Sequence, residues 1–124
     1  MCGVCGVVTL GPTPAPIDAV PDMVAALHHR GPDRQATWIE PEGRASFGHA
    51  RLSIVDLSPA GDQPMTSADG RWTITYNGEL YNAAEFRRAL PPEIRLRGHS
   101  DTEVLLESIA VRGPLAAVTA ARGM

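Results

Sequence analysis

Glycine and proline interrupt this chain so often that it can form only short helices and strands. The 124 residues include twelve glycines and eleven prolines, which together exceed the roughly 12% that these two residues reach in average proteins. Because proline removes a backbone donor and glycine favours turns, the pairs Gly31-Pro32, Pro91-Pro92 and Gly113-Pro114 mark element ends. Apolar residues still make up 44% of the chain, so we predict a folded domain rather than a disordered tail.

The segments between these interruptions predict a mixture of strands and helices. Strands are expected where apolar and β-branched residues cluster or alternate, and helices where apolar residues recur at helical spacing behind a capping residue. The expected strands are residues 2–10, 36–40, 45–50, 52–57, 71–76 and 93–97. Of these, 36–40 and 45–50 are expected to form a hairpin across residues 41–44. The expected helices are residues 18–30, 82–90, 100–112 and 115–122. Asp18 and Asn82 are the expected caps of the first two helices, and Ser100 and Glu103 are spaced as a capping box.

The charge balance and the apolar runs exclude several kinds of partner. The net charge is −3 and every basic residue is arginine, which argues against a surface for nucleic acid or anionic membranes. No apolar run approaches the roughly 18 residues of a membrane span, and the N-terminus does not resemble a signal peptide. We therefore expect a cytoplasmic protein that binds neither nucleic acid nor membranes.

Cys2, directly behind the initiator methionine, is a candidate nucleophile. Removal of Met1 would give this residue a free α-amino group, and such groups have a pKa of about 8. One residue would then supply both a thiol nucleophile and a base. The alternative is that a cysteine at position 2 has no catalytic consequence.

Cys2 and Cys5 also form a C-x-x-C pattern. Structural zinc would need two more ligands at suitable spacing, and the four histidines do not provide it. A thioredoxin-like site would need a strand before the first cysteine. We therefore interpret Cys5 as a small buried strand residue.

Three further positions allow both a chemical and a structural interpretation. Asn77-Gly78 is typical of a turn, but it could also present an amide side chain and a backbone N–H to an oxyanion. Arg51 is either a solvated charge at a strand end or a fork for a carboxylate. Asp101 is either part of the capping box or a partner for an ammonium group. Together with Cys2, these groups would suit hydrolysis of the side-chain amide of a free amino acid.

Six blocks resemble, in order and approximate spacing, the glutamine amidotransferase domain of asparagine synthetases, a class II glutaminase with an N-terminal nucleophile. The blocks are residues 1–6 (MCGVCG), 29–33 (HRGPD), 48–58 (GHARLSIVDLS), 63–65 (QPM), 77–82 (NGELYN) and 100–106 (SDTEVLL). The resemblance implies an α+β fold, the four-layer αββα sandwich of N-terminal-nucleophile hydrolases, with only its N-terminal part in this chain.

The resemblance also implies roles for individual residues. Cys2 matches the thiol that forms a glutamyl thioester, and Asn77 and Gly78 match the oxyanion hole. The HRGPD block is interpreted as architectural.

The substrate implied is L-glutamine. Arg51 matches the residue that binds its α-carboxylate, and Glu79 and Asp101 match positions that hold its α-amino group. The backbone expected to line this pocket belongs to Leu52, Ser53, Ile54 and Val55.

Glu79 and residues 51–58 favour asparagine synthetases over glucosamine-6-phosphate synthases and amidophosphoribosyltransferases. The same branch includes enzymes that amidate other acceptors, and this alternative stays open.

Two features depart from the family. Cys5 stands where alanine is common. Gly123-Met124 resembles the start of a segment that continues the sandwich in the family, and the rest of that segment is absent from these 124 residues. We therefore expect a truncated domain (residues 1–124) without its ATP-pyrophosphatase synthetase domain. ATP and magnesium are implied only for that domain, and no cofactor or metal is expected in this chain. The expected partner is a synthetase domain or a complementary chain; the alternative is a non-catalytic remnant or half of a split enzyme.

Overall fold

The computed structural model describes residues 2–54 and 56–124, and it confirms a mixed α and β fold made of short elements. The chain forms two compact units, which are described separately. The first unit contains residues 2–53, 62–64 and 75–77. The second contains residues 54, 56–61, 65–74 and 78–124.

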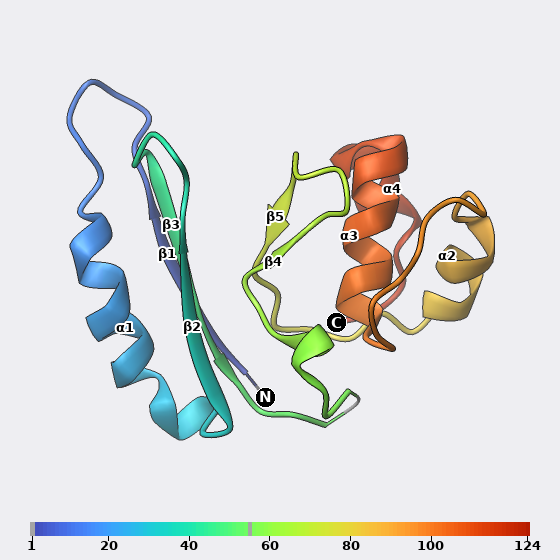
Figure 1. The fold of residues 1–124 in the computed structure, drawn as a ribbon, viewed down its shortest axis with the longest axis horizontal. Coiled ribbons are helices and arrows are strands. Elements are labelled where there is room, and N and C mark those ends of the chain that lie inside the picture. Colours follow the sequence, from blue (N-terminus) through green and yellow to red (C-terminus); the bar gives the residue numbers. More distant parts are fainter. Residues whose placement is uncertain (1, 55) are drawn as a thin grey trace. The chain divides into compact units, whose positions relative to one another are not determined.

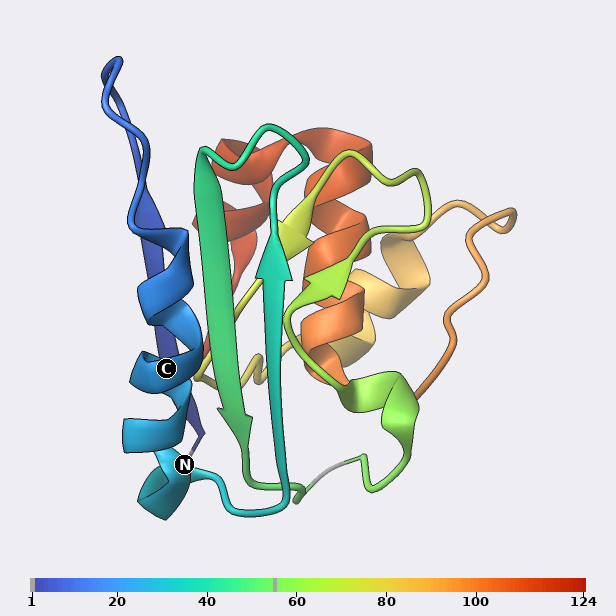
Figure 2. The ribbon, with the colours of Figure 1, turned by 60° about the vertical axis from the view of Figure 1, so that its left-hand side comes forward.

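The first unit is a three-stranded antiparallel sheet with a helix on one face (Figure 1). The strand order is β1-β3-β2, and β2 and β3 form the hairpin that the sequence predicts (Figure 2). The strands are β1 (Gly3–Val8), β2 (Arg34–Ile39) and β3 (Ala45–Arg51). The helical segments are η1 (Ile17–Ala19), α1 (Val20–Ala26) and η2 (His28–Arg30).

Small and aliphatic side chains fill the space between α1 and the sheet. Val20, Val24 and Ala50 are buried there, and full burial of one valine contributes roughly 1.5–3 kcal/mol. Around them pack the partly buried Cys5, Val7, Met23 and Leu27. Cys5 therefore lies in a strand beside the core, as expected, but it is only partly buried.

The second unit consists of a short hairpin and three main helices. The hairpin joins β4 (Met65–Thr66) to β5 (Thr73–Ile74), and the single turn η3 (Pro59–Gly61) precedes it. The helices are α2 (Ala83–Ala89), α3 (Asp101–Arg112) and α4 (Pro114–Ala120), and α3 packs against both of the others (Figure 1). The buried apolar side chains of this unit are Met65, Leu80, Phe86, Val104, Leu105, Leu106 and Ala117.

Helix α3 begins and ends where the sequence predicts. The Ser100 hydroxyl accepts a hydrogen bond from the Glu103 backbone N–H at 3.1 Å. The Glu103 side chain instead accepts from the backbone N–H groups of Arg97 and Gly98, so only half of the capping box forms. Gly113 ends the helix with φ = 86°, a value that favours glycine.

Several of the expected elements are wrong or shorter than predicted. Asp18 does not cap α1, because it lies within the turn η1 that leads into this helix. The N-cap position of α1 is Ala19, and no side chain makes a capping hydrogen bond there. Of residues 71–76, only Thr73–Ile74 form a strand, which is β5. Residues 93–97 form a turn and irregular backbone.

The described residues of segment 52–57 form no strand either. The Asp56 carboxylate accepts the backbone N–H of Ser58 at 2.8 Å and that of His99 at 2.8 Å. Such side-chain acceptors compete with the hydrogen bonds of a sheet, and they bend the backbone here.

Two small antiparallel sheets are present among the described residues, and the four-layer αββα sandwich stays a prediction. None of the helices in this described part combines the length and apolar character needed to cross a lipid bilayer.

Candidate functional site

Cys2 lies just before β1, beside the segment that follows β3. Its Sγ accepts a hydrogen bond from the Leu52 backbone N–H at 3.4 Å and lies 3.7 Å from the Leu52 carbonyl oxygen. The β1–β3 ladder produces this contact, because it pairs Gly3 with Ala50. The first unit thus brings the predicted nucleophile to the segment predicted to bind glutamine.

Arg51 is the last residue of β3, and its side chain is largely buried. Its Nη1 lies 2.5 Å from Oδ1 of Asp62, and the other oxygen of that carboxylate lies 2.5 Å from Nε of Arg34. The interpretation of Arg51 as a solvated strand-end charge is therefore wrong. Asp62 was not predicted as a site residue, because only the fold brings it to Arg51.

The HRGPD block crosses the end of β3. A Cβ on Gly31 would lie 2.1 Å from the Ala50 carbonyl oxygen, so this close approach requires glycine. Asp33 then joins the block to the segment after β3: its N–H donates to the Arg51 carbonyl at 3.1 Å, and its Oδ2 accepts from Ser53 N–H at 2.7 Å. These contacts support the architectural interpretation of the block.

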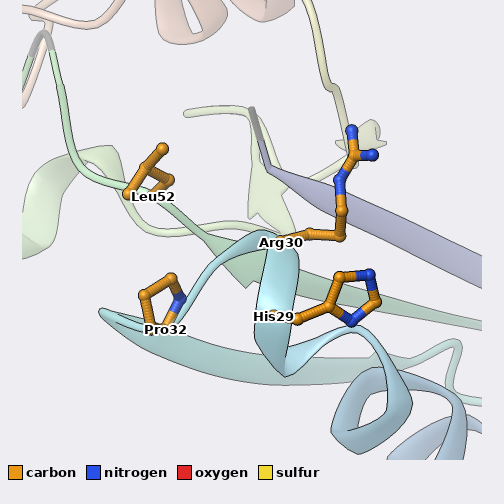
Figure 3. Close-up of a pocket in the computed structure, with 4 residues that line it drawn as sticks. All are labelled: His29, Arg30, Pro32 and Leu52. Atoms are coloured by element: carbon orange, nitrogen blue, oxygen red, sulfur yellow. The ribbon is translucent and has the colours of Figure 1, made fainter.

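The same block lines an open pocket of about 470 Å³. His29, Arg30 and Pro32 come from the segment that follows α1, and Leu52 comes from the segment that follows β3 (Figure 3). Leu52, one of the residues that line this pocket, also contacts Cys2 Sγ through its backbone. A pocket wall formed by the block was not predicted.

His49 lies two residues before Arg51 in β3 and is 1% exposed. Burial lowers its pKa, and the charge of Arg51 lowers it further; the Tyr76 backbone and Asp62 oppose this shift. Neither ring nitrogen reaches hydrogen-bonding geometry with any part of the chain that the structure describes. His49 is therefore held neutral next to the Arg51–Asp62 pair.

Asn77, Gly78 and Glu79 form an exposed loop. Asn77 belongs to the first unit and follows Tyr76, whose N–H donates to Gln63 Oε1 at 2.6 Å. Gly78 and Glu79 belong to the second unit, where Glu79 exchanges two backbone hydrogen bonds with Met124, at 2.9 and 3.1 Å. Asn77-Gly78 is therefore not the turn of a hairpin between β5 and the segment that follows it.

Asp101 is the first residue of α3, in the second unit. Its Oδ2 accepts from Leu80 N–H at 2.7 Å and its Oδ1 from Thr102 N–H at 2.8 Å. One carboxylate oxygen thus binds backbone at the start of α3, and the other binds the backbone of Leu80, before α2. Ile54 is also in this unit and is 71% exposed. Val55 lies outside the described residues.

The two cysteines differ in their surroundings. Cys5 packs against the core below α1, and burial raises the pKa of its thiol. Within residues 2–54 and 56–124, no group of three or more His, Cys, Asp or Glu side chains is placed to hold a metal ion.

Comparison with known proteins identifies similar sequences. Residues 1–124 match the family described as a glutamine amidotransferase domain. The chain is 46% identical over 93 residues to the glutamine-hydrolyzing asparagine synthetase 3 of Bacillus subtilis (strain 168), covering 69% of this chain and 14% of that protein. It is 39% identical over 106 residues to the glutamine-hydrolyzing asparagine synthetase of Triphysaria versicolor, covering 85% and 17%.

An amidase of Gibberella zeae, chry2, is 39% identical over 85 residues, covering 68% of this chain and 12% of the amidase. The chain therefore spans less than a fifth of the length of these relatives.

Proposed function

Because this chain belongs to the family of glutamine amidotransferase domains, we propose that it releases ammonia from the side-chain amide of L-glutamine, with Cys2 as nucleophile. The observation that carries this proposal is the contact between Cys2 Sγ and Leu52, whose backbone nitrogen lies 3.4 Å from the sulfur. Leu52 directly follows Arg51, the last residue of β3. A thiol that contacts the backbone next in sequence to a buried arginine fits a substrate with a reactive amide at one end and a carboxylate at the other.

The reaction proceeds by acyl transfer in two steps. The Cys2 sulfur attacks the amide carbon, the α-amino group left by removal of Met1 takes the thiol proton, and Asn77 and Gly78 donate hydrogen bonds to the developing oxyanion. The C–N bond breaks, ammonia leaves with that proton, and a γ-glutamyl thioester remains. Water then cleaves the thioester, which releases glutamate and returns a proton to the thiol. Met1 itself lies outside the described residues.

Binding of glutamine uses groups at its α-carbon. In this proposal the Arg51 guanidinium pairs with the α-carboxylate, and Glu79 and Asp101 pair with the α-ammonium group. In this proposal the backbone of Leu52, Ser53 and Ile54 contacts the bound glutamine, as does that of Val55, which lies outside the described residues.

The released ammonia needs a recipient. We propose that a synthetase domain or a complementary chain uses the ammonia for the ATP-dependent amidation of aspartate to asparagine, with ATP and magnesium bound there. The names of the bacterial and plant relatives support this recipient. The name of the fungal relative, an amidase, does not refer to asparagine synthesis, so amidation of another acceptor is a second candidate.

A mechanism-based label tests the first step. The protein is incubated with 6-diazo-5-oxo-L-norleucine, whose diazoketone carbon loses N₂ and forms a thioether with an activated thiol, and its intact mass is measured. We expect one adduct on a chain that begins at Cys2, and none on Cys2→Ala. The matched control is Cys5→Ala, because Cys5 is the second free cysteine and packs below α1; this variant should still be labelled.

Two results would contradict the proposal. Labelling of Cys2→Ala would show that the reagent reacts elsewhere, and an unlabelled wild-type protein with a folded circular dichroism spectrum would favour the non-catalytic remnant. Labelling that appears only after a complementary chain is added would identify a split enzyme.

The recipient has its own test. The protein with its partner domain is given amide-¹⁵N glutamine, aspartate, ATP and magnesium. ¹⁵N-asparagine supports asparagine synthesis, whereas ¹⁵N-ammonia without asparagine favours another acceptor.

A further inference from the structure

The carboxylate of Asp62 joins two arginines that lie directly opposite each other in the sheet. Arg34 of β2 is the ladder partner of Arg51 in β3, and like charges at such positions repel. Asp62 gives one oxygen to each: Oδ1 to Arg51 Nη1 at 2.5 Å and Oδ2 to Arg34 Nε at 2.5 Å. The bridge therefore removes a repulsion that would otherwise turn the two guanidinium groups apart.

Burial differs greatly among the three side chains. The side chain of Arg51 is 9% exposed, that of Asp62 is 19% exposed and that of Arg34 is 59% exposed. A buried guanidinium needs a charged partner at good geometry, so the direction of the Arg51 side chain depends on Asp62. The Arg34 side chain is mostly in solvent, and it is linked to Arg51 through the Asp62 carboxylate that both arginines contact.

The backbone around Arg51 is fixed independently of this bridge. The Arg51 carbonyl accepts from Asp33 N–H at 3.1 Å, and the next residue, Leu52, donates to Cys2 Sγ. The position of the thiol beside Leu52 is therefore set by the sheet, whereas Asp62 contacts the guanidinium of Arg51.

We propose that Asp62 is a positioning residue for glutamine: it orients Arg51 toward the α-carboxylate of the substrate, and Arg34 holds Asp62 in place. This inference rests on the proposed function, since it takes the pairing of Arg51 with that carboxylate as given. Asp62 does not touch the reacting amide, so its removal affects substrate binding and leaves the chemical step nearly unchanged.

The test compares glutamine with its α-amide, in which the α-carboxylate is replaced by an uncharged carboxamide. Ammonia release from each substrate is measured for the wild-type protein, with its full natural chain, and for Asp62→Asn. We expect KM for glutamine to rise about tenfold or more in Asp62→Asn, with kcat changed less than about threefold, the pattern of lost ground-state binding. The preference for glutamine over the α-amide should fall by a similar factor.

Two further variants separate positioning from stability. Asp62→Glu keeps the charge and both oxygens, so it should recover part of the preference for glutamine. Arg34→Gln removes a mostly exposed side chain, so it should stay folded while lowering the preference by a smaller factor than Asp62→Asn. A loss of stability alone would reduce the activity on both substrates together and leave their ratio unchanged.

Three results would overturn the inference. One is an unchanged ratio in both Asp62→Asn and Arg34→Gln, in a protein whose wild type is active. Another is a lower KM for glutamine in Asp62→Asn, which would mean that Asp62 competes with the substrate for Arg51. The third is a wild-type protein that is neither active nor labelled at Cys2; it would overturn the proposed function, and this inference with it.

Discussion

The Glu103 carboxylate is the acceptor that ties the loop before α3 to this helix, and its replacement by glutamine should destabilise the second unit. Its Oε1 accepts from the backbone N–H of Arg97 at 2.8 Å and from Arg97 Nε at 2.9 Å, and its Oε2 accepts from Gly98 N–H at 2.9 Å. The residue is 1% exposed. Water therefore cannot replace an acceptor that is lost.

The expected loss follows from these three hydrogen bonds. In Glu103→Gln the amide oxygen can still face Arg97, but the NH₂ group then faces the Gly98 N–H, so one acceptor becomes a donor. A hydrogen bond to a charged group contributes about 1.5–3 kcal/mol, and the ion pair with the half-exposed Arg97 adds about 0.2–1 kcal/mol. The free energy of unfolding should therefore fall by about 2–4 kcal/mol, estimated from the same two contributions.

Glu107 provides a matched control on the same helix. It is 2% exposed, and its Oε1 accepts from Ala68 N–H at 2.8 Å. A glutamine can keep that bond with its amide oxygen, so Glu107→Gln should cost less than about 1 kcal/mol, near the net value of a neutral hydrogen bond. Urea unfolding followed by circular dichroism at 222 nm measures both variants.

The effect of Glu103→Gln should also depend on pH. Burial raises the pKa of Glu103, but the hydrogen bonds from Arg97 and Gly98 outweigh it and hold the pKa below its ordinary value of 4.5. A carboxyl group with a lowered folded-state pKa stabilises fully above its unfolded pKa, and this stabilisation is lost as the pH falls through the folded value. Equal losses for the two variants at pH 7, or a difference that persists in strong acid, would refute the reasoning.

Two other changes test the first unit. Gly31→Ala places a Cβ 2.1 Å from the Ala50 carbonyl oxygen and should destabilise by more than about 3 kcal/mol, at the upper end of point substitutions, whereas Gly11→Ala, with open space around it, should be nearly neutral in thermal unfolding. The lowered pKa of His49 should make stability fall as the pH drops below 6.5, because the unfolded chain then takes up a proton that the folded one does not. His49→Gln should flatten this dependence by up to about 1.4 kcal/mol per pH unit. If stability depended on pH in the same way in His49→Gln and in the exposed control His99→Gln, the lowered pKa of His49 would not be the cause of the dependence.

Local signals predicted the elements that depend on neighbouring residues. The hairpin of β2 and β3 follows from two apolar runs around a turn, and α3 follows from Ser100 at its start and Gly113 at its end. The six sequence blocks likewise predicted the glutamine amidotransferase family, which is confirmed over residues 1–124. Segment 52–57 was predicted wrongly, because alternation alone does not reveal that Asp56 binds backbone N–H groups of Ser58 and His99.

The sequence by itself predicted the kind of chemistry: a cysteine at position 2, an arginine before an apolar segment and the Asn-Gly pair are the candidate groups. Only the tertiary structure decided their surroundings, because hydrogen bonds and ion pairs between distant residues leave no periodic trace in the sequence. The β1–β3 register brings Cys2 to Leu52, fifty positions away. The fold likewise brings Asp62 between two arginines that the β2–β3 ladder places side by side. The sequence therefore contains the candidate groups, and the folded backbone decides which of them come into contact.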